Sequence, residues 1–145
     1  MFTKRAAITL ATIAVIGLIL TATTTLVLGS PKGNSGVTGK NLDIFTDSKG
    51  TISCTNISWG NVNANSSITK TIYVKNPNTY KLTLTITVDN WTPEEAKSTL
   101  SVTSDKNNYA LPPGKIVPVV LTLTVGENMV ALTDFDCIIS FSGTQ

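Results

Sequence analysis

The chain has 145 residues, of which only 14% are charged, and its 11 basic and 9 acidic residues leave a net charge of +2. Lys4 and Arg5 account for that excess, so the rest of the chain is neutral and lacks the basic patch expected of a nucleic-acid-binding protein. The absence of histidine excludes Ser-His-Asp triads, His-paired cysteine nucleophiles and most zinc and copper sites. We therefore expect no catalytic residue, no metal or cofactor site, and a protein that is not an enzyme.

The first predicted element is an uncharged apolar run over residues 6–29, directly after Lys4 and Arg5. As a helix, these 24 residues would extend about 36 Å, enough to cross a hydrocarbon core of about 30 Å. Basic residues before the run predict a cytoplasmic N-terminus and an extracellular remainder. We expect the lipid bilayer to be a partner through residues 6–29 of a retained signal-anchor, with a cleaved signal peptide and secretion as the alternative.

A third interpretation rests on Arg5-Ala6-Ala7-Ile8, which resembles the cleavage site of archaeal type IV pilin precursors. The hydrophobic helix would then be retained and would pack a pilin-like subunit into a filament. Residues 30–41 are rich in Gly, Ser, Lys and Asn without an apolar period, which predicts a flexible linker. The expected organisation is an anchor or signal segment over residues 1–29, this linker over 30–41, and one domain over 42–145.

From Leu42 onward, apolar and polar residues alternate with period two, as in half-buried β-strands. The clearest predicted strands cover residues 67–75, 80–88, 115–125 and 135–141, and weaker ones cover 42–46, 51–57 and 99–103. Asn76-Pro77-Asn78-Thr79 predicts a hairpin loop between the first two. Thr92-Pro93-Glu94-Glu95 predicts a capping-box start for one short helix at residues 92–98. About seven such strands predict an all-β domain, an antiparallel β-sandwich of immunoglobulin-like type.

Two cysteines, Cys54 and Cys137, fall on inward positions of predicted strands. An oxidising exterior favours a disulfide between them, and two buried free thiols are the alternative. Three Asn-x-Ser/Thr patterns make Asn56, Asn65 and Asn90 candidate glycosylation sites, although chance alone would supply about as many in a chain so rich in Asn, Ser and Thr.

Two further groups of residues could form sites. Trp59 and Trp91 fit core positions at strand ends better than exposed carbohydrate platforms. The acidic residues Asp43, Asp47, Asp134 and Asp136 could gather around Ca²⁺, but their spacing matches no known loop, so solvated strand faces are favoured.

A set of short segments in this order suggests a family: Ile57-Ser58-Trp59-Gly60, Thr71-Ile72-Tyr73-Val74-Lys75-Asn76, Asp89-Asn90-Trp91-Thr92-Pro93, Leu111-Pro112-Pro113-Gly114, Val119-Val120-Leu121-Thr122-Leu123 and Asp134-Phe135-Asp136. The chain resembles an archaeal family of membrane-anchored or secreted immunoglobulin-like domains over residues 42–143. More distantly, its layout is similar to camelysin-type biofilm fibre subunits and archaeal donor-strand pili. The resemblance implies an extracellular fold and transfers no catalytic residue.

These observations favour a non-enzymatic cell-surface domain with a structural or adhesive role. Self-association could follow from strand exchange through residues 42–46, a short segment beside the predicted linker. The alternatives are a type IV pilin-like subunit packed through its N-terminal helix and a ligand-binding accessory subunit of a membrane complex. Other copies of the chain or other cell-surface proteins are the expected protein partners.

Overall fold

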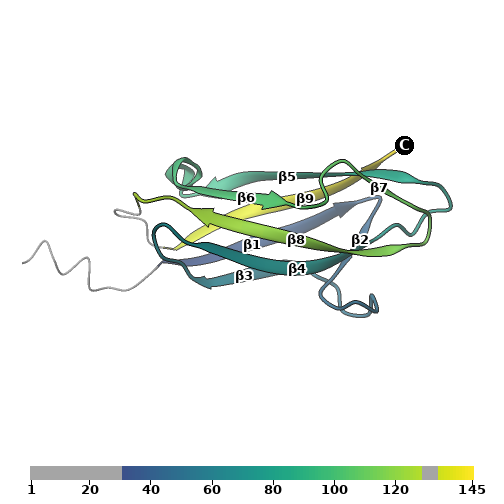
Figure 1. The fold of residues 1–145 in the computed structure, drawn as a ribbon, viewed down its shortest axis with the longest axis horizontal. Helices are drawn as coiled ribbons and strands as arrows, with labels where there is room; N and C mark the ends of the chain where they lie inside the picture. The colour runs from purple at the N-terminus through teal and green to yellow at the C-terminus, as the bar shows by residue number, and fades with distance from the viewer. Residues whose placement is uncertain (1–30, 129–133) are drawn as a thin grey trace, which may run out of the picture. The chain divides into compact units, whose positions relative to one another are not determined.

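Two β-sheets packed face to face make up the part of the chain that the computed structural model describes, residues 31–128 and 134–145 (Figure 1). One sheet has the strand order β3-β1-β9-β5-β7 and the other β2-β4-β8-β6. The strands are β1 Lys32–Lys40, β2 Asp43–Phe45, β3 Asn56–Asn61, β4 Ser67–Lys75, β5 Leu82–Thr92, β6 Leu100–Ser104, β7 Tyr109–Leu111, β8 Ile116–Val125 and β9 Phe135–Thr144. The predicted all-β sandwich is therefore confirmed.

The pairing is antiparallel at every described strand contact except the one between β1 and β9, which run parallel. The longest ladder joins β4 to β8 at the centre of one sheet, and β9 at the centre of the other sheet forms long ladders with both β1 and β5. β2 and β3 lie at one edge of the sandwich and β6 and β7 at the other, and each of these pairs switches from one sheet to the other along the chain. Each edge of the sandwich therefore consists of two short, consecutive strands, one from each sheet.

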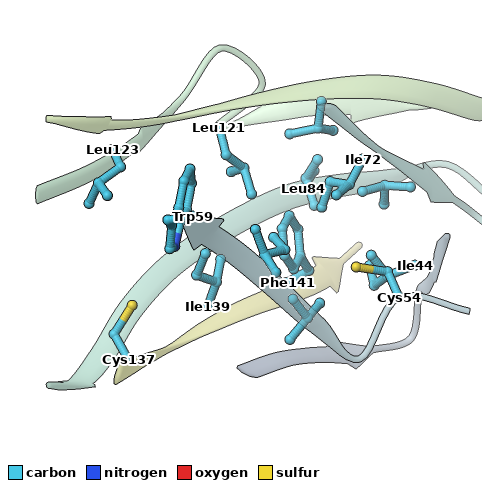
Figure 2. Close-up of a cluster of buried hydrophobic side chains, with 14 of the residues drawn as sticks. Ile44, Cys54, Trp59, Ile72, Leu84, Leu121, Leu123, Cys137, Ile139 and Phe141 are labelled. Atoms are coloured by element: carbon cyan, nitrogen blue, oxygen red, sulfur yellow. The ribbon is translucent and has the colours of Figure 1, made fainter. Parts of the chain in front are cut away.

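The core lies between the sheets and is filled by the inward row of each strand, as the period-two pattern predicts. β8 contributes Val119, Leu121, Leu123 and Val125, and β9 contributes Phe135, Cys137, Ile139 and Phe141. Ile86 and Val88 of β5 are only half-buried, and they lie beyond the Leu82–Leu84 stretch that pairs with β7. Figure 2 shows the central part of this cluster, with Trp59 standing among leucine and isoleucine side chains.

The predicted linker over residues 30–41 is wrong for most of its length. Lys32–Lys40 form β1, which lies inside a sheet with neighbours on both sides, β3 and β9. The apolar period that would have indicated a strand is missing because two of its three buried positions are Gly33 and Ser35. The domain therefore begins before residue 42. The predicted anchor or signal segment, residues 1–29, lies outside the described residues.

Two local predictions also require correction. Asn76-Pro77-Asn78-Thr79 is not a hairpin loop, because β4 and β5 belong to different sheets and the segment crosses between them. The predicted helix is a short 3-10 helix, η1 (Glu94–Ser98), and its N-cap is Pro93 without a side-chain cap hydrogen bond. Thr92 cannot serve as the cap since it is the last residue of β5, in register with Asp136.

Other strand predictions hold with shifted boundaries. In the predicted strand over 51–57, residues 51–55 contribute only an isolated bridge at Ser53, and the strand begins at Asn56. β1 and β7 were not predicted at all. Among the residues that the structure describes, no helix is long and apolar enough to cross a membrane.

Candidate functional site

The most distinctive feature of the described domain is the slot between β3 and β9 that β1 fills. β1 buries Gly33, Ser35 and Val37 and directs Lys32, Asn34, Gly36 and Thr38 away from the core. Its ladder with β9 runs from the Gly33–Phe135 pair to the Lys40–Ser142 pair. On its other side, β1 pairs with β3 from Lys32–Asn61 to Gly36–Asn56. The strand is therefore bonded through its backbone on both edges, like a central strand.

The first fitted position is Gly33, which lies directly beneath the ring of Phe135. A Cβ atom at Gly33 would stand 2.1 Å from the Cζ atom of Phe135, far inside van der Waals contact. Phe135 is itself buried, so its ring has little space into which it could move. Only glycine fits this position without displacing the ring.

The second fitted position is Ser35, a fully buried polar residue. Its Oγ accepts a hydrogen bond from Nε1 of Trp59 on β3 at 2.8 Å. The same oxygen lies 3.0 Å from Sγ of Cys137 on β9, and either atom can be the donor. One hydroxyl therefore connects three adjacent strands, and it satisfies the only polar atom of a buried tryptophan.

Contacts at both ends hold β1 in this slot. At its start, the Val62 amide donates to the Pro31 carbonyl at 2.9 Å, and the Lys32 amide donates to Oδ1 of Asp134 at 3.1 Å. At its end, Asn41 has a φ of 63° and donates from Nδ2 to the Gly143 carbonyl at 3.1 Å. A tight turn therefore links β1 to β2.

Sequence reasoning missed Gly33 and Ser35 as fitted residues. The usable signal was the alternation Gly33, Ser35, Val37, in which small residues occupy one face of an extended segment. Glycine inside a strand commonly marks a close approach by another group, which here is the Phe135 ring.

The predicted disulfide is not present, since Cys54 and Cys137 are both free thiols. Both are buried, as the sequence pattern indicated. Cys54 precedes β3, on the far side of β1 from β9, whereas Cys137 lies in β9 itself. Two strand spacings of about 4.8 Å exceed the Cα separation of at most about 7 Å that a disulfide tolerates. The two thiols lie at separate places in the core in Figure 2.

We expect both thiols to react slowly in the native protein. Burial raises the pKa of the Cys54 thiol and is also the main cause of the raised pKa of Cys137, to which the nearby charge of Asp136 adds. Because the thiolate is the reactive form, iodoacetamide at about pH 8 should modify neither cysteine in the folded chain and both after denaturation. The exposed thiol of a Thr38→Cys variant provides the fast-reacting control. Rapid native alkylation at Cys54 or Cys137, or an intact mass that rises on reduction, would contradict the structure.

The two tryptophans have different surroundings. Trp59 is buried in the core, as predicted. Trp91 is half-buried, and its ring centroid lies 6.2 Å from that of Phe135. Neither ring is an open platform for a sugar.

The four aspartates do not form a metal site. Asp47 closes its own loop by accepting hydrogen bonds from the backbone amides of Thr51 and Ile52 and from the Thr51 hydroxyl. The hydrogen bond from that hydroxyl is the main reason that the pKa of Asp47 is lowered. Within residues 31–128 and 134–145, no three His, Cys, Asp or Glu side chains are grouped to hold a metal ion.

All three candidate glycosylation residues are exposed. Asn56 begins β3, and Asn90 lies in β5 with a φ of 54°. Asn65 lies in the turn between β3 and β4, with a φ of 56°. Its position in an exposed turn makes Asn65 the most accessible acceptor of the three.

The outer faces of both sheets carry rows of hydroxyl groups. Thr85 and Thr87 of β5 are in register with Ser142 and Ser140 of β9, and Thr38 of β1 donates to Oγ of Ser140 at 3.0 Å. On the opposite sheet, the register places three strands' hydroxyl residues in two rows, Ser67–Thr124–Ser101 and Thr69–Thr122–Thr103. These rows contain no charged side chain.

No protein-family model and no curated protein sequence matches this chain. The fold and the slot therefore define it as a two-sheet β-sandwich whose first described strand is inserted beside its last.

Proposed function

We propose that this protein is a non-enzymatic cell-surface domain with a structural or adhesive role. Residues 6–29 hold it in the lipid bilayer, and the β-sandwich lies on the extracellular side. The observation that carries the proposal is the set of uncharged Ser and Thr rows on the outer faces of both sheets. Such faces suit neutral contact with neighbouring surface molecules, whereas a nucleic acid would require clustered positive charge.

The immunoglobulin-like type of the sandwich belongs to the same proposal. In immunoglobulin constant domains one sheet has the strand order A-B-E-D, and the other contains C, F and G. β2-β4-β8-β6 matches the first order, and the neighbours β5 and β9 take the places of C and F. Domains of this type recur on cell surfaces with many functions, so the likeness supports a location and an architecture without naming a ligand.

Self-association by strand exchange through residues 42–46 is the assembly mode that the sequence suggested. β2 (Asp43–Phe45) has the short, peripheral character that this idea requires, because it has three register pairs with the end of β4 and one bridge, Phe45–Ser53, on its other side. Only three register pairs join β2 to β4, so the β2 strand of a second copy would have few backbone contacts to replace.

The test combines location with processing in cells that produce the full chain. Protease added to intact cells should degrade the β-sandwich of a chain that fractionates with membranes, and intact cells without protease and lysed cells with protease serve as the controls. Intact-mass and N-terminal analysis of the same material reports cleavage and any glycan at Asn56, Asn65 or Asn90. A β-sandwich that is protected until the cells are lysed would contradict the proposal. A native N-terminus at Ala7 would contradict the signal-anchor and support the alternative, a pilin-like subunit packed through its N-terminal helix.

A further inference from the structure

One neighbour of β9 in its sheet is β1, the first described strand, and this differs from a simple immunoglobulin-like sandwich. In that arrangement the neighbour of F is G, the strand that follows it. Here the neighbour of β9 is β1, which precedes every other described strand and runs parallel to β9. The slot is therefore completed by a segment joined to the rest of the domain through the turn at Gly39–Leu42.

β1 contributes little apolar surface of its own to the core. Val37 is its only buried apolar side chain, whereas β9 buries Phe135, Ile139 and Phe141. What β1 supplies is two rows of backbone hydrogen bonds and cover for the side chains of Phe135, Cys137 and Trp59. An identical strand from another molecule supplies the same bonds and the same cover.

We infer that β1 is the exchangeable strand of this protein. Lys32–Lys40 of one copy fill the slot between β3 and β9 of a second copy, in the register seen within one chain. The inference rests on the proposed self-associating surface role and names the segment and the partner. The exchanged segment is then β1, which lies between β3 and β9 in one sheet, and residues 42–46 are not exchanged.

Packing in the slot opposes a shift of β1 by two residues. A shift by two residues keeps the same face of β1 inward but brings Ser35 to the place of Gly33, beside the ring of Phe135. A Cβ atom at that place would stand 2.1 Å from the ring, so the serine side chain does not fit there. The same shift removes the Ser35 hydroxyl from Trp59 and leaves a buried indole N–H without its acceptor. The slot therefore selects an extended segment with Gly, Ser and Val at alternate positions, which is the pattern of β1.

A second feature favours self-association through this slot over pairing of two copies at the open edge of β4. β2 leaves the Ser67–Ile72 half of β4 without a neighbour on its outer side. Lys70 lies there in register with the buried Leu121, so an exposed lysine takes a position on the inward row of β4 at this open edge. Inward-facing charges on edge strands oppose pairing with other sheets.

The experiment uses two single-cysteine substitutions in the full chain in detergent, with Cys54 and Cys137 both replaced by alanine so that no native thiol can cross-link during refolding. Thr38→Cys lies in β1, and Ser140→Cys lies opposite it in β9, where the two native hydroxyl oxygens are 3.0 Å apart. The two variants are mixed, unfolded in denaturant, refolded together and treated with a mild oxidant. Exchange should give at least about tenfold more disulfide-linked dimer than either variant alone, because docking of β1 brings the two thiols together at high effective concentration.

Three controls separate the outcomes. The double variant carrying both substitutions should form the disulfide between positions 38 and 140 within one chain when refolded at high dilution and between chains at the concentration of the mixture, which verifies the register in both cases. A mixture of Thr38→Cys with Ser142→Cys should remain at the level of the single variants, since Ser142 pairs with Lys40. Equal cross-linking to Ser142→Cys would overturn the register, and no cross-link in the Ser140→Cys mixture would overturn the exchange. Self-association of the wild-type chain by sedimentation, together with its display on cells, reports separately on the proposed function.

Discussion

The Asn76→Asp variant should lose about 3 to 5 kcal/mol of unfolding free energy, the range for an uncompensated charge in a buried site. Asn76 is fully buried, and its Nδ2 atom donates to the carbonyl oxygens of Tyr80 at 2.7 Å and Leu111 at 3.1 Å. A carboxylate has no proton to donate, so it would face two carbonyl oxygens with a negative charge. Denaturant unfolding followed by tryptophan fluorescence measures the difference.

The size of this effect follows from the number of segments that meet at Asn76. Its backbone amide donates to the Lys115 carbonyl at 2.9 Å, and its own carbonyl accepts from the Gly114 amide at 2.9 Å. Its Oδ1 accepts from the Asn78 amide at 3.0 Å. One side chain and its peptide groups therefore hold the crossing from β4 to β5 against the turn before β8.

Asn107→Asp is the matched control for this prediction. Asn107 is exposed, and its Oδ1 only accepts a hydrogen bond, from the Ile86 amide at 2.9 Å. An aspartate keeps that acceptor, so the change should be within about 0.5 kcal/mol. The loss in Asn76→Asp should shrink on acidification, because burial raises the pKa of the new carboxyl and its protonated form can donate one bond. Equal stability of the two variants would contradict the assigned network.

Gly33→Ala should destabilise the domain by about 2 to 3 kcal/mol, as expected when a well-packed site is overfilled. The added methyl carbon would stand 2.1 Å from the ring of the buried Phe135, and either the ring or β1 must move. Gly36→Ala is the control on the same strand, since its Cβ would meet Ile138 at an ordinary 3.8 Å.

The comparison between the two glycines isolates packing from backbone effects. Both residues lie in β1, and neither has a positive φ. Each substitution by alanine therefore lowers the conformational entropy of the unfolded chain by a similar amount. Gly36→Ala should change the unfolding free energy by no more than about 0.5 kcal/mol. Chemical denaturation of both variants measures the difference, and a loss of the same size at Gly36 would show that β1 is sensitive to substitution as such.

The sequence predicted the strands whose inward rows are large and apolar, and it missed those whose inward rows are small. Leu121, Leu123 and their neighbours in β8 carry a period-two pattern that only a half-buried strand explains. β1 lacks that pattern because the aromatic side chains above it, Phe135 and Trp59, occupy the volume that its own side chains would take. Close packing therefore removed the hydrophobic signal from the segment that completes the sheet.

The site residues were predictable only in part for a related reason. Parity along a strand placed Cys54 and Cys137 correctly in the core, but it carries no information on which strands become neighbours, and the order β3-β1-β9 separates the two thiols. Asn76 looked like an ordinary loop residue, since nothing local shows that Leu111, far along the chain, would provide an acceptor. Thr92 fitted a helix cap until its pairing with Asp136 extended β5 through it.

The parallel pairing of β1 and β9 also determines how the described domain would carry tension. A pull applied at Lys32, where β1 begins, and at Thr144, where β9 ends, acts at opposite ends of two adjacent strands (Figure 1). The load then runs along the ladder in shear, so its hydrogen bonds resist together and do not open one after another from an end. A sandwich with this arrangement is mechanically suited to a molecule that is held at one end and pulled at the other.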